Sequence, residues 1–405
     1  MAHDTILVRI RGRDAPGITA GLLDILSLGG AQVHDMEQVV VRGRLTLDLL
    51  VGLSEEHQTL KDLLFFGWQR GIEIEFDVVD DQPVPPIGPR YAVTLLAPDL
   101  SADALAGATA AIAGAGGNID RILRLSDYPV MSYEFIVSGA DFDHLRKGLL
   151  DASQAFRLDI AVQPEGLQRR AKRLVVLDVD STLIENEVID LLAQEAGRVE
   201  AVAAITDRAM RGELDFEAAL RSRVETLRGL DTAALERVAA KISLTPGART
   251  FVRTLKRLGY EIVLVSGGFE FFVDALGADL GVDHTFANRL VIENGTLTGE
   301  LEGPIIDRAG KAEVLRRIAA ERGIPVEQTV AVGDGANDLD MLAAAGLGIA
   351  FNAKPLVRAA ADTAVSVPYL DAILFLLGIR RDDVEAADAA DPTFDREPRR
   401  GPAQT

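Results

Sequence analysis

The apolar positions of residues 6–162 follow an order of strands and helices that occurs twice. Residues that alternate between apolar and polar predict strands, and apolar residues three or four positions apart predict helices. The first copy has predicted strands at 6–10, 32–41, 45–53 and 72–79 and predicted helices at 17–28 and 56–70. The second copy repeats this order, with strands beginning at residues 91, 118 and 130, helices at 102–115 and 141–154, and a last strand. Each copy is therefore expected to form a βαββαβ unit, an α+β structure whose helices cover one face of its sheet.

The pattern changes after residue 172. Strands predicted at 174–177, 261–265 and 329–332 alternate with helical segments, which is typical of an α/β, Rossmann-like parallel sheet. Residues 186–244 have helical periodicity and no strand pattern. We therefore expect an all-helical cap inserted after the first strand of the parallel sheet.

Prolines between the two copies, at positions 83, 85, 86 and 89, predict a linker. The expected domains are residues 1–82, 90–165 and 172–380, with the cap at about 186–244. The last segment, 381–405, is rich in Asp, Ala, Pro and Arg. It is expected to be a disordered tail.

Composition narrows the class of protein. With 48% hydrophobic residues, the 405-residue chain can bury substantial cores. Its 62 acidic and 42 basic residues give a net charge of −20, which argues against a nucleic-acid surface or an anionic membrane as partner. The chain has no cysteine, which excludes disulfides, thiol catalysis and zinc–thiolate sites. It lacks a long apolar stretch and a signal-like start, so a cytoplasmic protein is expected.

Two carboxylates, Asp178 and Asp180, follow the predicted strand 174–177. Side chains of a strand alternate with a period of two, so both carboxylates leave the strand on the same side. Two acidic groups held together repel each other unless a cation or a shared proton relieves them. The pair therefore predicts a metal site with acid/base chemistry.

Two further signals suit an anionic ligand. Ser266, Gly267 and Gly268 follow the predicted strand 261–265, and a hydroxyl before two glycines exposes backbone N–H groups that hold phosphate in other loops. Lys311 opens a predicted helix, where a cation opposes the helix dipole unless an anion lies nearby. A lone surface lysine is the alternative interpretation of Lys311.

A third signal is the loop Gly333-Asp334-Gly335-Ala-Asn337-Asp338, after the predicted strand 329–332. Its glycines allow a sharp turn, and its acids and amide can point back toward the strand ends. An acidic loop directly after a buried strand is otherwise unfavourable. All of these signals lie at the carboxyl ends of predicted strands, where open α/β sheets have their sites.

The order and type of these residues resemble the haloacid dehalogenase superfamily of phosphatases. The resemblance implies that Asp178 is the nucleophile and forms an aspartyl-phosphate, and that Asp180 is the general acid and base. It also implies that Ser266 and Lys311 hold the phosphoryl oxygens, with Gly267, Gly268 and Asn337 beside the substrate. Mg²⁺ would be bound by the carboxylates of Asp178 and Asp334 and by the backbone carbonyl of Asp180, and Asp338 would support these ligands.

Within that superfamily, residues 178–187, 210–224 and 333–341 resemble the phosphoserine phosphatases. The resemblance implies that Glu187 binds the substrate ammonium and that Arg223 binds its carboxylate, while Met210 and Phe216 close over the ligand. A helical ion pair is the alternative for Glu187 and Arg223, but neither has an opposite charge three or four positions away. Met210 and Phe216 could equally be core residues of the cap.

The tandem βαββαβ units resemble ACT domains, regulatory modules that often bind amino acids. In the first copy Asp14-Ala-Pro16-Gly17-Ile18 carries the resemblance, whereas Asp99-Leu-Ser101-Ala102 replaces the Pro-Gly turn in the second. The resemblance implies an amino-acid effector such as serine at Asp14 and Gly17, feedback regulation, and a homodimer formed edge to edge. The alternative is that Pro16 and Gly17 only start a helix.

Two rival functions remain open from the sequence. One is a phosphatase for another small metabolite, such as phosphothreonine or a sugar phosphate. The other is an amino-acid sensor whose catalytic half is an inactive scaffold. Glu187 and Arg223 disfavour a sugar phosphate, which has no ammonium or carboxylate, and the joint presence of Asp178, Asp180 and Lys311 disfavours the sensor.

Overall fold

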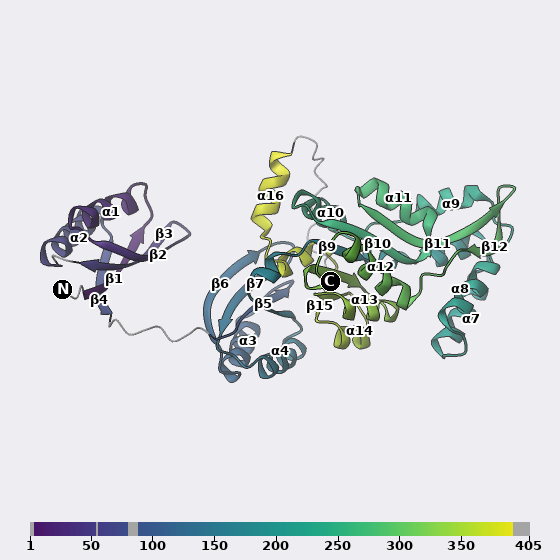
Figure 1. Cartoon of the computed structure of the whole chain (residues 1–405), viewed down its shortest axis with the longest axis horizontal. Helices are drawn as coiled ribbons and strands as arrows, with labels where there is room; N and C mark the ends of the chain where they lie inside the picture. The colour runs from purple at the N-terminus through teal and green to yellow at the C-terminus, as the bar shows by residue number, and fades with distance from the viewer. Residues whose placement is uncertain (1–3, 54–55, 80–87, 392–405) are drawn as a thin grey trace. The chain divides into compact units, whose positions relative to one another are not determined.

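A computed structural model of the chain describes residues 4–53, 56–79 and 88–391 (Figure 1). The chain divides into two compact units, Met1–Pro86 and Ile87–Thr405. Across the described residues, no helix is both long enough and apolar enough to cross a bilayer.

The first unit has the predicted βαββαβ order. Its elements are β1 (Asp4–Arg13), α1 (Ile18–Leu28), β2 (Gln32–Val41), β3 (Arg44–Leu53), α2 (Glu56–Arg70) and β4 (Glu73–Val79). The strands form one antiparallel sheet in the order β2-β3-β1-β4. Alternate residues of β1 and β3, such as Val8 and Leu47, are buried in one core with Leu22 of α1 and Leu63 of α2. This period-two burial is the reason that the sequence pattern predicted these strands correctly.

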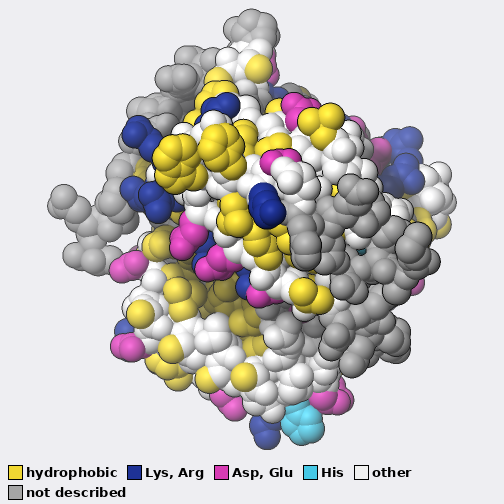
Figure 2. All heavy atoms as spheres, turned by 90° about the vertical axis from the view of Figure 1, so that its left-hand side faces the viewer, with side chains coloured by type: hydrophobic (Ala, Val, Ile, Leu, Met, Phe, Trp, Pro, Cys, Tyr) yellow, Lys and Arg dark blue, Asp and Glu magenta, His cyan; other side chains and the backbone are white. Residues whose placement is uncertain are grey.

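The first unit also exposes apolar surface. Hydrophobic side chains lie next to one another on the face shown in Figure 2. Helix α2 exposes Leu64, Phe65 and Trp68, and the rings of Phe65 and Trp68 stack at 5.9 Å. The edge strand β2 is exposed along its whole length, including Met36 and Val39. Unpaired strand edges and contiguous apolar patches are surfaces that partners use.

The second unit begins with another βαββαβ arrangement. Its elements are β5 (Arg90–Ala97), α3 (Ala102–Gly114), β6 (Asn118–Ser126), β7 (Met131–Ser138), α4 (Phe142–Phe156) and β8 (Asp159–Pro164). The sheet order is β6-β7-β5-β8, and α3 and α4 bury Ala108 and Leu149 against Val93 and Leu95 of β5. The predicted fold class is thus confirmed for both copies.

A seven-stranded sheet follows, in the order β12-β11-β10-β9-β13-β14-β15. Its strands are β9 (Leu174–Leu177), β10 (Glu261–Phe269), β11 (His284–Glu293), β12 (Thr296–Glu302), β13 (Thr329–Gly333), β14 (Gly348–Phe351) and β15 (Thr363–Val365). All neighbouring pairs are parallel except β11 and β12. The predicted Rossmann-like sheet is therefore confirmed, and the β11–β12 hairpin is an addition that the sequence pattern did not predict.

Helices surround this sheet (Figure 1). The segment after β9 contains the cap helices α6 (Val188–Glu195), α7 (Val199–Met210), α8 (Phe216–Glu225) and α9 (Thr232–Ala239). The others are α10 (Ala248–Arg257), α11 (Glu270–Leu280), α12 (Arg308–Glu321), α13 (Leu339–Ala344), α14 (Pro355–Ala360), α15 (Ile373–Leu376) and α16 (Arg381–Ala390).

The two faces of the parallel sheet have different cores. Leu174 and Val176 of β9 pack with α12, α13 and α14, whereas Val175 and Leu177 pack with α10 and α15. The core that contains Val175 and Leu177 also contains Leu96 and Ala161 of the second βαββαβ sheet. This sheet therefore buries the face opposite its own helices against the Rossmann-like part of the same unit.

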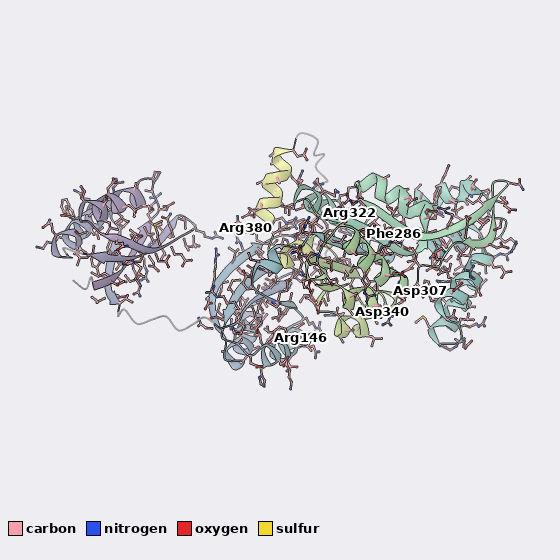
Figure 3. All side chains as sticks on the ribbon, viewed as in Figure 1. Arg146, Phe286, Asp307, Arg322, Asp340 and Arg380 are labelled. Atoms are coloured by element: carbon pink, nitrogen blue, oxygen red, sulfur yellow. The ribbon has the colours of Figure 1, made fainter. Side chains whose placement is uncertain are left out.

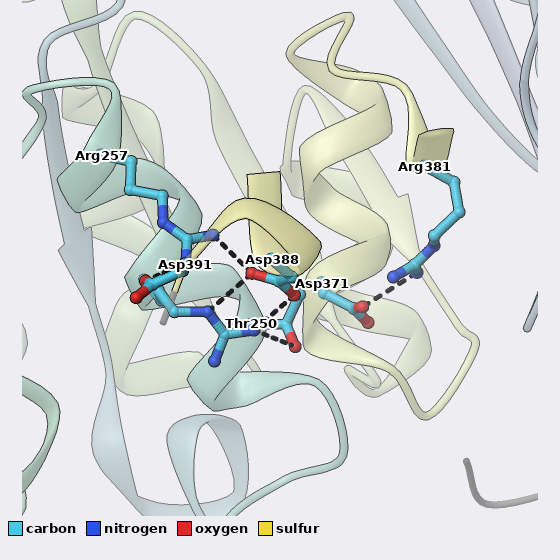
Figure 4. A network of polar contacts seen from close by, with 7 residues as sticks. Thr250, Arg257, Asp371, Arg381, Asp388 and Asp391 are labelled. Atoms are coloured by element: carbon cyan, nitrogen blue, oxygen red, sulfur yellow. Dashed lines mark hydrogen bonds and ion pairs between the residues drawn. The ribbon is translucent and has the colours of Figure 1, made fainter. Parts of the chain in front are cut away.

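The C-terminal segment corrects one prediction. Residues 381–390 were expected to be disordered but form the helix α16. Asp388 of α16 accepts hydrogen bonds from Arg253 Nη2 at 2.8 Å and Nε at 3.0 Å and pairs with Arg257 (Figure 4). Val384 is buried in the core. The local composition hid this helix because its partners lie about 130 positions away. Residues 392–405 lie outside the described residues.

Candidate active site

The Asp178 carboxylate lies at the carboxyl end of β9, on a tight loop. Ser181 in this loop has φ 56°, a left-handed conformation that is uncommon for a residue other than glycine. The loop turns Asp180 so that its Oδ1 accepts from the backbone N–H of Val188 at 3.0 Å. Its Oδ2 accepts from Ser266 Oγ at 2.8 Å. Asp178 and Asp180 thus line one cavity. Both lie beyond the end of β9, so the turn at Ser181 rather than the period of the strand brings Asp180 there.

The Lys311 ammonium lies beneath this cavity with no exposed surface. It donates to Asp178 Oδ1 at 2.5 Å and to Asp338 Oδ1 at 2.7 Å. Burial alone would lower the pKa of Lys311, but the two carboxylates overcome that effect and raise it. The two carboxylates therefore favour the charged form of Lys311. They are also the nearby anions that a cation at a helix start needs.

Asp178, Asp334 and Asp338 form a carboxylate cluster in which one oxygen from each lies within 4.8 Å of the others. Burial, together with Asp338, raises the pKa of Asp178 well above its usual range, against the effect of Lys311. Burial and Asp338 also raise the pKa of Asp334 to about 6. One lysine cannot neutralise three ionised carboxylates, so a further cation among them would favour their ionised forms.

The donor set suits a hard divalent cation. Both oxygens of Asp338 are already used, because Oδ2 accepts from the Gly335 N–H at 2.9 Å and Oδ1 from Lys311. Among the described residues, the second oxygens of Asp178 and Asp334 accept no hydrogen bond, and Asp334 Oδ1 accepts a long one of 3.3 Å from Thr182. Carboxylate oxygens without hydrogen-bond donors are ligands that Mg²⁺ prefers.

A cavity of about 350 Å³ opens above these groups. Its walls come from the β9 loop, the cap, the end of β10, the loop after β13, and α14. The lining residues include Asp178, Asp180, Glu187, Ile189, Phe216, Leu220, Arg223, Gly267, Gly268, Phe269, Asp334, Gly335, Ala336, Asn337, Lys354, Leu356 and Val357. A cavity of this size holds a small molecule rather than a macromolecular chain.

Two opposite charges of the cap line the cavity. Glu187 accepts from Ser181 Oγ at 2.7 Å, and its partial burial and the nearby Asp180 raise its pKa to about 7. The cavity walls also lower the pKa of Arg223, against the effect of Glu187. Arg223 Nε is buried without a hydrogen-bond partner among the described residues. A buried donor without an acceptor is unfavourable in a folded protein unless a ligand satisfies it.

The glycines near the carboxyl end of β10 permit close contacts. A Cβ atom on Gly268 would lie 2.8 Å from Asp180 Oδ2, and one on Gly267 would lie 3.0 Å from the Phe216 ring. Side chains at these positions would push the acid and the cap away from the cavity. The need for space therefore explains glycine at both positions.

Three family models match the chain: haloacid dehalogenase-like hydrolase over residues 175–343, and ACT domain over residues 4–77 and 90–163. A phosphoserine phosphatase of Streptomyces coelicolor is 53% identical over 95% of this chain and 94% of its own length. The phosphoserine phosphatase SerB2 of Mycobacterium tuberculosis is 45% identical over 96% and 97%. The chain belongs to the phosphoserine phosphatase family.

A solved structure agrees with this family assignment. The crystal structure of a probable phosphoserine phosphatase from Vibrio cholerae matches with a TM-score of 0.58 and 32% identity, over 75% of this chain and 90% of that one. The predicted resemblances to the phosphoserine phosphatases and to ACT domains are therefore confirmed.

Most residues predicted from the sequence as site residues of this family line the cavity, but Met210, Ser266, Lys311 and the fully buried Asp338 do not. Met210, at the end of α7, is 73% exposed and lies outside the lining. Ser266 and Lys311 are fully buried beneath it. Ser266 binds Asp180 and accepts from the Gly268 N–H at 2.7 Å, so its hydroxyl orders the loop around the acid.

The wall formed by α14 and the residue before it was not predicted from the sequence. Lys354, Leu356 and Val357 line the cavity, and they follow β14 at the same carboxyl edge of the sheet as the other site loops. A short apolar run followed by Asn352-Ala-Lys354-Pro355 was the available signal. It is weak, because such loops are common.

The candidate effector residues lie in the first unit. Gly17 has φ 87° and precedes the first turn of α1, a conformation that by itself accounts for glycine. Asp14 is exposed, and its N–H donates to the Gly43 carbonyl at 2.9 Å. Ligand binding at Asp14 and Gly17 remains a prediction.

Proposed function

We propose that the protein is a Mg²⁺-dependent phosphatase that hydrolyses O-phosphoserine to serine and phosphate, the last step of serine biosynthesis. The observation that supports this most strongly is the shared cavity of Asp178 and Asp180 with Glu187 and Arg223. Asp178 and Asp180, which suit phosphate transfer, line one side of the cavity. Glu187 and Arg223, whose opposite charges suit an amino acid, line the side formed by the cap. The names of the relatives agree with this assignment.

The proposed metal ligands are the carboxylates of Asp178 and Asp334 and the backbone carbonyl of Asp180, with Asp338 and Lys311 behind them. When bound, Mg²⁺ supplies positive charge that offsets the repulsion between the substrate phosphate and the carboxylates. The raised pKa values of Asp178 and Asp334 support a cation at this position, since both acids ionise more readily beside one.

Asp178 is the proposed nucleophile. One of its carboxylate oxygens attacks phosphorus, the bond between phosphorus and the serine oxygen breaks, and Asp180 gives a proton to the departing oxygen. Asp180 then takes a proton from water, which attacks the aspartyl-phosphate and releases phosphate. Lys311, at 2.5 Å from Asp178, keeps this carboxylate oriented through both steps.

Glu187 and Arg223 are proposed to select the amino-acid part of the substrate. The unpartnered donor of Arg223 suits a planar carboxylate, which guanidinium binds through two parallel hydrogen bonds. Glu187 provides the anion for the ammonium group. Phe216 contributes an apolar wall beside Gly267.

A phosphate-release panel tests the reaction and the substrate class together. Phosphoserine, phosphothreonine, glycerol phosphate and a sugar phosphate are compared with Mg²⁺ and with a chelator. We expect phosphoserine to be preferred and turnover to need the metal. Replacement Asp178→Asn should lower kcat by more than about a thousandfold, whereas Asp340→Asn, at an exposed ion pair with Arg308, should not. Turnover by Asp178→Asn would mean that another group is the nucleophile.

We further propose that the ACT domains bind an amino-acid effector such as serine and that the protein forms a homodimer through the first unit. The exposed edge strand β2 and the apolar side chains of α2 support such a contact. Light scattering of Val39→Lys tests the dimer, since a lysine on an edge strand disfavours pairing. A serine titration of turnover, repeated with Asp14→Ala, tests the effector site; identical responses would reject it.

A further inference from the structure

A second cavity lies between α4 and β8 of the second ACT domain and the α14–β15 region of the hydrolase domain. Its volume is about 850 Å³, within the range of small-molecule sites. Hydrogen bonds connect the two domains beside this cavity. Gln163 Nε2 donates to the Leu376 carbonyl at 2.8 Å, and the Ser366 N–H donates to Asp159 Oδ2 at 2.5 Å. Both sides belong to one compact unit.

One wall of this interdomain cavity is apolar. It contains Leu96, Phe142, Leu149 and Leu150 from the ACT domain, and Leu347 lies on the hydrolase side. Leu150 is 54% exposed, although neighbouring positions of the same helix are used for the core. Apolar surface that remains exposed inside a cavity favours a ligand with a hydrocarbon or aromatic body.

The charged groups of the interdomain cavity favour an anion. Arg146, Arg157 and Arg358 line it, and Figure 3 shows Arg146 on the side of the ACT domain that faces the hydrolase domain. Among the described residues, neither Arg146 nor Arg157 has an ion-pair partner. The acids of the lining are engaged: Asp159 accepts from Ser366 and lies 3.7 Å from Arg358.

Asp362, the other acid of the lining, accepts from the Gly348 N–H at 2.8 Å. Two arginines therefore remain available in a protein of net charge −20. Guanidinium groups bind carboxylates through paired, charge-assisted hydrogen bonds.

Helix α14 is a wall common to both cavities. Lys354, Leu356 and Val357 line the active-site cavity, whereas Pro355 and Arg358 line the interdomain cavity. The helix is only six residues long, so a ligand that contacts one side cannot shift it without moving the other. One contiguous helix therefore contacts both cavities, which is the arrangement that coupling between them would need.

We propose that the interdomain cavity binds a small carboxylate with an apolar body through Arg146 and Arg157, and that its occupancy changes substrate binding through α14. The site is distinct from the effector site predicted at Asp14 and Gly17, because it lies in the other unit. The coupling part rests on the proposed function, but binding itself does not.

Calorimetric titration of the full chain with 3-phenylpropionate tests binding. We expect one saturable site per chain and at least about tenfold weaker binding in the double variant Arg146→Gln/Arg157→Gln. The matched control Lys147→Gln/Arg121→Gln removes two exposed cations of the same domain that lie outside the lining, and it should bind normally. The neutral amide of the same acid should also bind at least about tenfold more weakly.

Absence of saturable binding up to about 10 mM would overturn the proposed site, and so would equal binding by the arginine double variant or by the neutral amide. Coupling is measured as the KM for phosphoserine with saturating probe. We expect a change of at least about twofold in the original chain and none in the arginine variant; an unchanged KM would refute transmission through α14. If the chain fails to hydrolyse phosphoserine, the proposed function fails while calorimetry still decides the site.

Discussion

Replacement Glu187→Gln tests how the cavity recognises the amino group of the substrate. Glutamine keeps the shape and the hydrogen bond with Ser181 but removes the charge. Loss of a hydrogen bond to a charged group costs about 1.5–3 kcal/mol. Part of Glu187 faces solvent, which screens the interaction, so we expect the lower end of that range. This corresponds to a KM for phosphoserine that rises about tenfold, with a smaller change in kcat.

The pH dependence makes this test sharper. With a pKa of about 7, Glu187 is charged above neutrality and protonated below it, so its contribution to substrate binding should be present at about pH 8 and lost toward about pH 6. The substrate phosphate also titrates, near about pH 6. The informative quantity is therefore the ratio of KM between Glu187→Gln and the original chain, which should fall as the pH decreases.

The assay is steady-state phosphate release from phosphoserine at several pH values, with Glu185→Gln as the control. Glu185 is an exposed neighbour in the sequence that does not line the active-site cavity, so its KM should match the original chain. A ratio that stays constant from about pH 6 to about pH 8 would show that Glu187 does not bind the ammonium group as an anion. An unchanged KM at pH 8 would refute the recognition altogether.

Three further predictions address recognition and stability. Arg223→Lys should raise KM for phosphoserine about tenfold and leave KM for glycerol phosphate nearly unchanged, because an ammonium lacks the paired donors of guanidinium. Lys354→Met should raise KM about threefold at low ionic strength and less at high salt, because this exposed cation attracts the anionic substrate. Asp388→Ala should lower the free energy of unfolding by about 2 kcal/mol, because Arg253 and Arg257 lose a partly buried acceptor.

Each of these has a result that contradicts it. If Arg223→Lys raises KM equally for phosphoserine and for glycerol phosphate, Arg223 stabilises the fold and does not bind the substrate carboxylate. If the effect of Lys354→Met on KM does not change with salt concentration, Lys354 contributes by packing rather than by its charge. For stability, Asp382→Ala is the control on the same helix, at an exposed position; equal unfolding curves for the two variants would show that the contacts of Asp388 contribute nothing.

The parts of the fold that the sequence predicted correctly are those with local causes. The period-two burial of β1 and β3 and the buried strand β9 follow from neighbouring residues. The lack of an i, i+4 partner for Arg223 agrees with the structure, where its Nε has no hydrogen-bond partner among the described residues. The site residues at the carboxyl end of β10 and in the loop after β13 were found because parallel strands end at one edge.

Other features depended on contacts between distant segments. Lys311 is a buried partner of Asp178, because α12 packs behind β9, and its contact with the phosphoryl oxygens stays a prediction. Met210 carried the family motif but lies exposed at the end of α7. Helix α16 was hidden by a composition typical of disorder, although Arg253 and Arg257 hold it in place.

By itself, the amino-acid sequence determined the chemistry of this protein: which acids are nucleophile and acid candidates, which strands carry them, and which modules precede them. These properties repeat at short intervals along the chain, so local periodicity reveals them. Only the tertiary structure decided which charged side chains are paired with opposite charges. It also decided that α14 lies between two cavities. Burial and electrostatic pairing depend on segments brought together by folding, and no short window of sequence contains both partners.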